Sequence, residues 1–380
     1  MTQAYDLNVA KKIVIKIGSS LIVDSSTGAR TTWLNSLADD VASLIGENKE
    51  VIIVSSGAIA LGKSILNLKN EKLRLDQKQA AAAVGQIELG SLFRDAFAQT
   101  DIHCAQILLT SEDTEQPCRS LNARATIGSL LDFCTVPIVN QNDTFATAEV
   151  RNGDNDRLSA RIARMCSADL LIIFSEMDGL FTGPPSDPDS QFISEVEKIG
   201  PAVEAIAEKL QSDRGTGGMA TKVQAAKIAT QAGTHVIITN GLDLNPVSRL
   251  RNGGRRTSFP TQDSPLSARK KWIASDLSPC GKIYIDEDAV AAIENNGSLL
   301  CVGVVHQEGE FKRGDILEIA SEYDVVVARG ISAYDRKEAD LLMGHKAGEI
   351  EALLGYCGPE NLVHCDDMIV FSTAEISNER

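Results

Sequence analysis

Short runs of apolar, β-branched residues alternate with longer segments of helical periodicity from residue 12 to about residue 240. The runs predict strands at 12–17, 51–55, 104–109, 136–140, 170–174 and 235–239, with helical patterns between them, for example at 77–98, 156–167 and 217–232. Most runs are apolar at every position, which is typical of strands covered by helices on both faces. The pattern predicts an α/β fold, a three-layer sandwich around a mainly parallel sheet.

The pattern changes after residue 250. The stretch "RNGGRRTSFPTQDSP" at 251–265 is rich in Gly, Pro, Ser and Thr, and it predicts a loop or linker. From residue 279, short β-like segments alternate with Gly turns, as in "GKIYID", "SLLCVGVV", "GDILEIA" and "DVVVARGIS". We therefore expect two domains, at 1–265 and 279–357, the second small and rich in β-strands, followed by a polar end that is partly loose.

Composition narrows the functional classes. The net charge of −15 argues against a general nucleic-acid binder, whose surface is basic. The eight cysteines are scattered without a Cys-x-x-Cys pair, which fits reduced thiols better than a zinc site or a disulfide framework. Neither a leader pattern nor a run of eighteen apolar residues is present, so we expect a cytoplasmic protein that does not associate with a membrane.

The residues that follow the predicted strands are the candidate site, because ligands of open α/β sheets gather at the carboxyl ends of the strands. These residues are Lys16 and Gly18 in "KIGSS", Ser56, Gly57 and Ala58 in "SSGAIALG", Asn140 and Asp143 in "NQND", and Ser175 and Glu176. Each stretch alone also fits an ordinary turn. The argument for a site is that all of them fall where a single cleft is expected.

Two Gly-rich segments, "SSGAIALG" and "GTGGMATK" at 215–222, lead into helices. Backbone N–H groups at a helix start attract anions, and Lys16 and Lys222 beside these segments indicate a phosphate ligand. No P-loop consensus and no H-R-D or D-F-G motif of protein kinases occurs.

The segment "NGDNDRLSAR" at 152–161 places Asp154, Asn155 and Asp156 just ahead of a helical pattern. These residues suit a metal site, a turn with a helix cap, or a grip on a small charged substrate. Asp156 alone suits the cap, because acids are preferred at helix starts.

Four motifs in this order, "VIKIGSS", "VIIVSSGAIALG", "VPIVNQNDTFATAEVRNGDNDRLSA" and "GTGGMATKVQAA", resemble the amino acid kinase family and, within it, the glutamate 5-kinases. The match covers about residues 11–275, and residues 279–355 resemble a PUA domain, a small β-barrel. The resemblance implies synthesis of γ-glutamyl phosphate from L-glutamate and ATP with Mg²⁺, the first step of proline biosynthesis. It further implies proline as a feedback inhibitor, and we expect a homo-oligomer.

Carried over by motif, the resemblance makes Lys16 and Lys222 the catalytic residues that meet the ATP phosphates. The implied substrate-binding residues are Ser56, Gly57, Ala58, Asn140, Asp143, Asp154 and Asn155. The implied ATP-binding residues are Lys16, Gly18, Ser175, Glu176, Thr216, Gly217, Gly218, Met219, Ala220, Thr221 and Lys222. Mg²⁺ is expected mainly on the ATP phosphates, with Asp156 as a further candidate for a cap or for placing the metal.

The expected chemistry agrees with these roles. A carboxylate is already a nucleophile, so its phosphorylation needs no general base, and catalysis rests on positioning and charge neutralisation. The "GDND" block is then best interpreted as a substrate grip. The chain departs from the family pattern on the nucleotide side, with Ser175 and Glu176 in place of Thr-Asp and "GLFTGPP" in place of "GLYT-x-DP".

Three alternatives remain. A related kinase of the same fold would act on N-acetylglutamate, aspartate or carbamate, and the "GDND" block and the PUA-like C-terminal part speak against it. RNA binding through the PUA-like domain is a weaker alternative, because acids offset the Lys and Arg residues of "FKRGD" and "YDRKEAD". A non-catalytic amino-acid sensor conflicts with the presence of both lysines.

Overall fold

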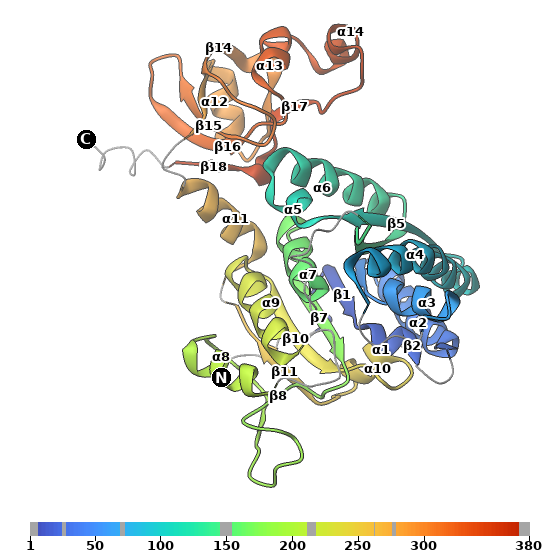
Figure 1. The fold of residues 1–380 in the computed structure, drawn as a ribbon. Helices are drawn as coiled ribbons and strands as arrows, with labels where there is room; N and C mark the ends of the chain where they lie inside the picture. The colour runs from blue at the N-terminus through green and yellow to red at the C-terminus, as the bar shows by residue number, and fades with distance from the viewer. Residues whose placement is uncertain are drawn as a thin grey trace. The chain divides into compact units, whose positions relative to one another are not determined.

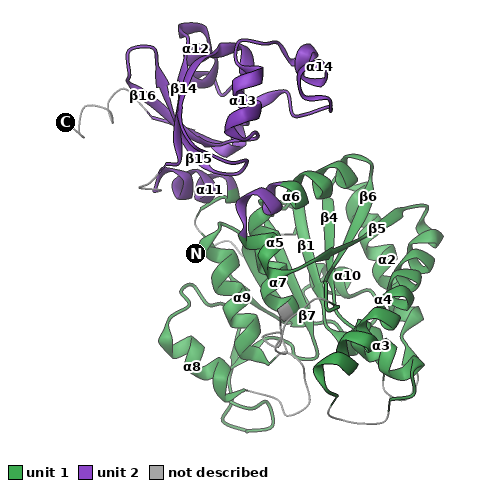
Figure 2. Ribbon diagram, turned by 45° about the horizontal axis from the view of Figure 1, so that its top comes forward, with its two compact units in different colours: residues 1–115, 122–265 green, residues 116–121, 266–380 purple. Residues whose placement is uncertain are grey.

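The computed structural model describes residues 7–24, 28–68, 73–144, 154–210, 218–261, 263–275 and 279–371. The chain forms two compact units, which Figure 2 colours separately. Residues 1–115 and 122–265 make up the first unit, and residues 116–121 and 266–380 make up the second. The short segment 116–121 thus belongs to the second unit, although residues 122–265 of the first unit follow it in the sequence. The sequence pattern did not indicate this exchange.

A seven-stranded sheet forms the centre of the first unit, in the order β11-β10-β7-β1-β4-β6-β5. Figure 1 labels β1, β5, β7, β10 and β11 among its strands. Neighbouring strands are parallel except for the antiparallel pair β10 and β11. The strands are β1 (Lys12–Ile17), β4 (Glu50–Ser55), β5 (His103–Leu109), β6 (Thr135–Gln141), β7 (Leu170–Ser175), β10 (His235–Asn240) and β11 (Arg256–Phe259). The predicted α/β class is confirmed, and each of the six predicted strands is present to within one residue at either end.

Strand β11 lies inside the stretch that the sequence predicts as a loop or linker, and that prediction is wrong for its middle part. Three of the four residues of β11 are buried, and Val236 pairs with Phe259 across the sheet. The Thr257 hydroxyl donates to the carbonyl of Ile193 at 2.6 Å and accepts the N–H of Leu180 at 2.8 Å. A four-residue strand flanked by Gly and Pro is too short to show a hydrophobic period, so its burial was hidden.

Helices cover both faces of this sheet and give the predicted three layers. Ile13, Ile15 and Ile17 of β1 pack in one core with the helices of the first layer, whereas Val14 packs in a second core with the other helices. The first layer contains α2 (Thr31–Gly46), α4 (Leu75–Phe97) and α10 (Pro246–Arg251), and the other contains α6 (Pro117–Asp132), α7 (Asp154–Met165), α8 (Pro201–Lys209) and α9 (Met219–Gln231). Alternate residues of β1 therefore point to opposite layers, as the pleat of a strand requires.

Helix α3 (Ala58–Ile65) crosses α4 at unusually close range. A Cβ atom on Gly62 would lie 1.8 Å from the carbonyl oxygen of Ala81, and one on Gly85 would lie 1.8 Å from that of Ala58. Only glycine permits this approach of two backbones. The contact fixes the start of α3 against the middle of α4.

The remaining short elements of the first unit are α1 (Ser19–Ile22), β2 (Val23–Asp24), β3 (Gly28–Ala29), η1 (Ala98–Thr100), α5 (Ser111–Glu115), β8 (Leu180–Phe181) and β9 (Phe192–Ile193).

The second unit has a five-stranded sheet in the order β14-β12-β15-β16-β18 and a hydrophobic core of its own. Its strands are β12 (Gly281–Ile285), β13 (Leu299–Leu300), β14 (Val304–Gly309), β15 (Ile316–Ser321), β16 (Val326–Ile331), β17 (Asn361–Val363) and β18 (Met368–Val370). Its helices are α11 (Pro265–Ala274), α12 (Glu287–Glu294), η2 (Cys301–Gly303), α13 (Arg336–Leu342), η3 (Ala347–Glu349), α14 (Ile350–Leu354) and η4 (Cys365–Asp367).

The β-rich character predicted for this part is confirmed. Within the polar end that the sequence predicts to be partly loose, residues 361–363 and 368–370 form β17 and β18, and residues 372–380 lie outside the described part. In the parts of the chain that the structure describes, no helix combines the length and apolar character needed to cross a bilayer.

Candidate active site

The candidate site lies at one edge of the seven-stranded sheet. Strands β7, β1, β4 and β6 are consecutive neighbours and run parallel, so their carboxyl ends meet at this edge. Lys16, Ser56, Asn140 and Ser175 all lie at or just after these ends. The structure therefore brings together residues that the sequence places up to 159 positions apart, from Lys16 to Ser175.

Lys16 and Lys222 converge on one carboxylate. Lys16 lies on the face of β1 that is covered by α7 and α9, and its Nζ is 2.5 Å from Oδ1 of Asp156 on α7. Lys222 lies one turn into α9, with its Nζ 3.3 Å from Oδ2 of Asp156. The Thr221 hydroxyl donates to the same Oδ2 at 2.7 Å. We call Lys16, Asp156, Thr221 and Lys222 the lysine cluster.

The lysine cluster is buried and carries an excess of positive charge. Lys16 and Lys222 are 6% and 7% exposed and Asp156 is 0% exposed. Burial acts to raise the pKa of Asp156, but the two ammonium groups overcome it and lower that pKa to about 2. Burial also lowers the pKa of Lys222; Asp156 opposes this effect and Lys16 adds to it. Because two ammonium groups share one carboxylate, the cluster has one uncompensated positive charge, which favours an anionic ligand.

The position of Asp156 corrects one interpretation of the sequence. Asp156 was suited to capping a helix, but α7 begins at Asp154, two residues earlier, and the Asp156 carboxylate faces the two lysines. Both of its oxygens are engaged, Oδ1 by Lys16 and Oδ2 by Thr221 and Lys222. The counter-ion role was missed, although two lysines directed at one buried cleft require an acid nearby.

Asn155, the residue next to Asp156, belongs to a different set of contacts. Its Nδ2 has two N–H groups, which are shared among the carbonyl oxygen of Ser55 at 3.0 Å, Oγ of Ser56 at 2.9 Å and Oδ1 of Asn140 at 3.0 Å. Its Oδ1 is buried and has no hydrogen-bond partner among the described residues. Asn155 thus ties the end of β4 to the end of β6 and keeps one acceptor atom open.

Asn140 continues this set of contacts towards α4. Its Oδ1 accepts the backbone N–H of Gln141 at 2.8 Å, and its Nδ2 donates to Oε1 of Gln86 at 2.7 Å. We call Gln86, Asn140, Asn155 and Ser56 the amide network. Gln86 was not predicted as a site residue, because a glutamine within a helical pattern carries no motif signal.

Two helix starts lie at this sheet edge. Gly57 is the N-cap of α3 and has φ = +112°, a conformation that glycine adopts readily, so Ser56, Gly57 and Ala58 form a tight turn into the helix. Gly218 is the N-cap of α9, followed by Met219 and Ala220, and its carbonyl accepts the Thr221 hydroxyl at 2.9 Å. Thr216 and Gly217 lie outside the described residues, as does the side chain of Asp154.

The remaining predicted residues have mixed surroundings. The Ser175 hydroxyl is engaged locally, because it accepts the N–H of Met177 and donates to its carbonyl, both at 3.1 Å. Glu176 is exposed, and its charge raises the pKa of Lys222. Gly18 is the N-cap of the short helix α1.

Asp143 is half-buried and lines a pocket of about 300 Å³ next to the amide network. Gln86, Gln106 and Gln141 line the same pocket, with residues of α4, β5 and the end of β6 around them. Gln86 and Asp143 therefore connect the amide network with a space large enough for a small ligand.

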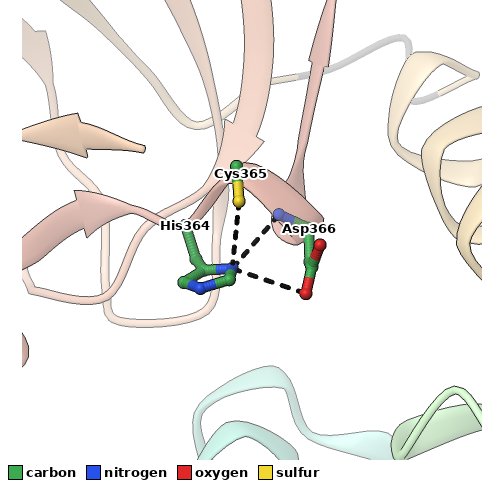
Figure 3. Close-up of side chains that lie close together, drawn as sticks. All are labelled: His364, Cys365 and Asp366. Carbon is green, nitrogen blue, oxygen red and sulfur yellow. Dashed lines mark hydrogen bonds and ion pairs between the residues drawn. The ribbon is translucent and has the colours of Figure 1, made fainter. Parts of the chain in front are cut away.

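One convergent group of metal-ligand side chains occurs in the described parts of the chain, and it lies in the second unit. It consists of the consecutive residues His364, Cys365 and Asp366 at the start of η4 (Figure 3). Nδ1 of His364 accepts the backbone N–H of Asp366 at 3.1 Å, so the imidazole caps this turn and its lone pair is already used. No other such group of His, Cys, Asp or Glu side chains is found beside the lysine cluster among the residues described there.

The comparisons with known proteins agree with this geometry. The model of the amino acid kinase family matches residues 11–240, and that of the PUA domain matches residues 281–354. Glutamate 5-kinase from Rhizobium rhizogenes is 46% identical over 381 aligned residues, which cover 100% of this chain and 98% of the relative. Glutamate 5-kinase from Agrobacterium fabrum is 47% identical over 364 residues, covering 96% of this chain and 94% of the relative. The chain belongs to the amino acid kinase family and, within it, to the glutamate 5-kinases with a C-terminal PUA domain.

Proposed function

We propose that this protein phosphorylates the γ-carboxylate of L-glutamate with ATP and so catalyses the first step of proline biosynthesis. The observation that carries the proposal is the position of the lysine cluster beside the amide network at one sheet edge. The full-length similarity to glutamate 5-kinases supports the same activity.

The lysine cluster suits phosphoryl transfer to a carboxylate. The acceptor oxygen is ionised at neutral pH, so the enzyme has to align it with ATP and to neutralise charge on the transferring group. Lys16 and Lys222 supply two ammonium groups, and Asp156 holds both in place without cancelling their combined charge. Mg²⁺ on the ATP phosphates supplies further charge neutralisation. In this proposal the ATP phosphates carry most of the contacts to Mg²⁺, and Asp156 is a further candidate for placing the ion.

The amide network suits the substrate end. Asp143 offers a carboxylate for the substrate ammonium group, and Oδ1 of Asn155 is a buried acceptor with no hydrogen-bond partner among the described residues. The Ser56 hydroxyl and the N–H groups at the start of α3, beyond Gly57, suit a carboxylate group. Asn140 and Asp154 complete the surroundings of the substrate in this proposal.

The nucleotide is assigned to the other side of the lysine cluster, with Gly18, Ser175, Glu176 and residues 216–222 around it. Inhibition by proline and a homo-oligomeric assembly belong to the same proposal. Both follow from the resemblance of the chain to its family.

An acceptor panel tests the function. The full-length protein is incubated with ATP, Mg²⁺ and hydroxylamine, which traps acyl phosphates, and with glutamate, aspartate, N-acetylglutamate or carbamate in turn. We expect hydroxamate from L-glutamate at a kcat/KM at least ~100-fold above any other acceptor, since a missing charged contact costs roughly 2–3 kcal/mol. Equal or greater turnover of N-acetylglutamate would make the protein a different kinase of the same fold.

A further inference from the structure

We propose that Gln86 is a positioning residue for the carboxylate substrate. It acts through two successive side-chain amides, those of Asn140 and Asn155, and need not touch the substrate itself. The inference rests on the proposed function, because it concerns the affinity for the phosphoryl acceptor.

The first step is the orientation of Asn140. This residue is 1% exposed, so each polar end of its amide needs a protein partner. The backbone N–H of Gln141 lies 2.8 Å from one end, and since an N–H can only donate, that end is the oxygen. The nitrogen then faces α4, where Oε1 of Gln86 accepts its hydrogen bond at 2.7 Å.

The second step passes this orientation to Asn155. Because Asn140 presents its oxygen, Asn155 presents its nitrogen at 3.0 Å, and the same nitrogen reaches Ser55 and Ser56. The oxygen of Asn155 is thereby left as a buried acceptor without a partner in the described part of the chain. A rotated Asn140 would place two N–H₂ groups face to face and would release Asn155.

The fold keeps Gln86 where this sequence of contacts requires it. The preceding residue, Gly85, is in backbone contact with Ala58 at the start of α3, directly after the Ser56–Gly57 turn. Gln86 and Ser56 are therefore held at a fixed spacing by the same helix crossing.

A double-mutant cycle on the full-length protein tests the proposal. Gln86→Met keeps the length of the side chain and removes the acceptor. It should raise the KM for glutamate about tenfold, which corresponds to 1.4 kcal/mol, and should leave kcat and the KM for ATP within about twofold. In an Asn140→Ala background, Gln86→Met should change the KM for glutamate by less than about twofold, since its target is gone. If the increases in KM caused by Gln86→Met and by Asn140→Ala multiply in the double variant, the proposal is wrong.

Two further variants separate positioning from pocket shape. Gln106→Met changes another glutamine that lines the same pocket but makes no hydrogen bond to the amide network. Any effect of Gln106→Met on the KM for glutamate should multiply with that of Asn140→Ala, whereas the effect of Gln86→Met should not. An effect of Gln106→Met that also disappears in the Asn140→Ala background would assign the change to the pocket and contradict the proposal. Gln86→Glu keeps the acceptor oxygen, so its KM should lie closer to that of the wild type than the KM of Gln86→Met. The opposite order would also contradict the proposal, and this comparison stands if Gln86→Met does not fold.

The wild-type acceptor panel is measured first, so the two proposals fail separately. If the wild type prefers another carboxylate, the proposed function is wrong. The same cycle is then run with that preferred acceptor, and its outcome still decides the role of Gln86.

Discussion

The lysine cluster and the amide network are built on adjacent residues of one helix turn, yet they are held together by different forces. Asp156 faces two ammonium groups in a fully buried ion cluster, whereas Asn155 faces neutral amide, hydroxyl and carbonyl groups. The lysine cluster supplies the positive charge of the site, and the amide network fixes the orientation of its polar side chains. Among the described side chains of the site, the buried charges of Lys16, Lys222 and Asp156 lie together in the lysine cluster.

The difference has an energetic reason. Buried charges lose their hydration and are tolerated only with a partner at close range, so the loss of one member leaves a large penalty on the rest. A buried amide without its partner costs less, about 1–3 kcal/mol, but its two ends are distinct and so define an orientation. Substitutions in the two sets should accordingly differ in size and in the kinetic constant that changes.

The largest effect is expected for Asp156→Asn, which leaves Lys16 and Lys222 buried without a counter-charge. The free energy of unfolding should fall by about 3–5 kcal/mol, as for other buried ion pairs that lose one partner. Trp33 is fully buried in the first unit and Trp272 is exposed, so urea denaturation followed by Trp33 fluorescence in a Trp272→Phe background reports on this unit. Asp95→Asn, in an exposed ion pair with Arg94, is the control and should cost less than about 1 kcal/mol. Equal losses of unfolding free energy in Asp156→Asn and Asp95→Asn would mean that the lysine cluster depends on its carboxylate no more than an exposed ion pair does.

Lys222→Met and Lys16→Met should each lower kcat at least ~100-fold, with a modest change in the KM for glutamate. Charge neutralisation is realised mainly in the transition state, and methionine keeps most of the buried stem. The hydroxamate assay measures both constants. Lys227→Met is the control, because Lys227 lies on the same helix in an exposed ion pair with Glu204. A lysine variant with near-normal kcat would remove that lysine from the charge-neutralising role.

Asn155→Ala and Ser56→Ala should raise the KM for glutamate about 10- to 100-fold and leave the KM for ATP nearly unchanged. Each change removes a hydrogen bond to a charged substrate, worth about 1.5–3 kcal/mol. Initial rates over both substrate concentrations give the two constants, and Asn122→Ala on the exposed side of α6 serves as the control. Lost ATP affinity with retained glutamate affinity would move Asn155 to the nucleotide side.

The smallest effect concerns acid stability. The pKa of Asp156 is lowered from 3.8 to about 2 in the folded protein, so its ionised form favours folding. This contribution is complete above the unfolded pKa of 3.8 and is lost as the pH falls towards 2, a change of roughly 2 kcal/mol. The stability difference between the wild type and Asp156→Asn should therefore shrink between pH 5 and pH 2. Denaturation curves of the two proteins over this range, again through Trp33, measure it. A constant difference would contradict the assigned ionisation.

The sequence predicted strands of five or more residues well, whether they are fully buried like β7 or only partly buried like β5. β1 and β7 read as unbroken apolar runs because both of their faces are covered. β11 was missed because four residues show no period, and helices of five to eight residues such as α12, α13 and α14 were hidden among turn residues. The length of an element, more than its composition, thus separates the predicted elements from the missed ones.

The site divides in a similar way. Lys16 and Lys222 were found because glycine-rich helix starts mark them. Asp156 was included in the "GDND" block, but its role as a counter-ion was missed because its partners lie on β1 and α9, far away in the sequence. An acid at a helix start is also explained by helix capping alone. Gln86 gave no signal, since its contact with Asn140 spans 54 residues and a glutamine on a helix normally faces water.

The alternation of side chains along β1 makes the catalytic lysine a matter of strand register. Lys16 shares the face of Val14, while Ile15 and Ile17 on either side pack into the opposite layer. Deleting one residue anywhere between 12 and 15 would exchange the two faces, so that isoleucine would meet Asp156 and the lysine would be driven into the apolar core. The strand would still be an apolar, β-branched sequence of nearly the same composition. The loss of a single codon within this strand would therefore remove the lysine from the site although the strand keeps its apolar character.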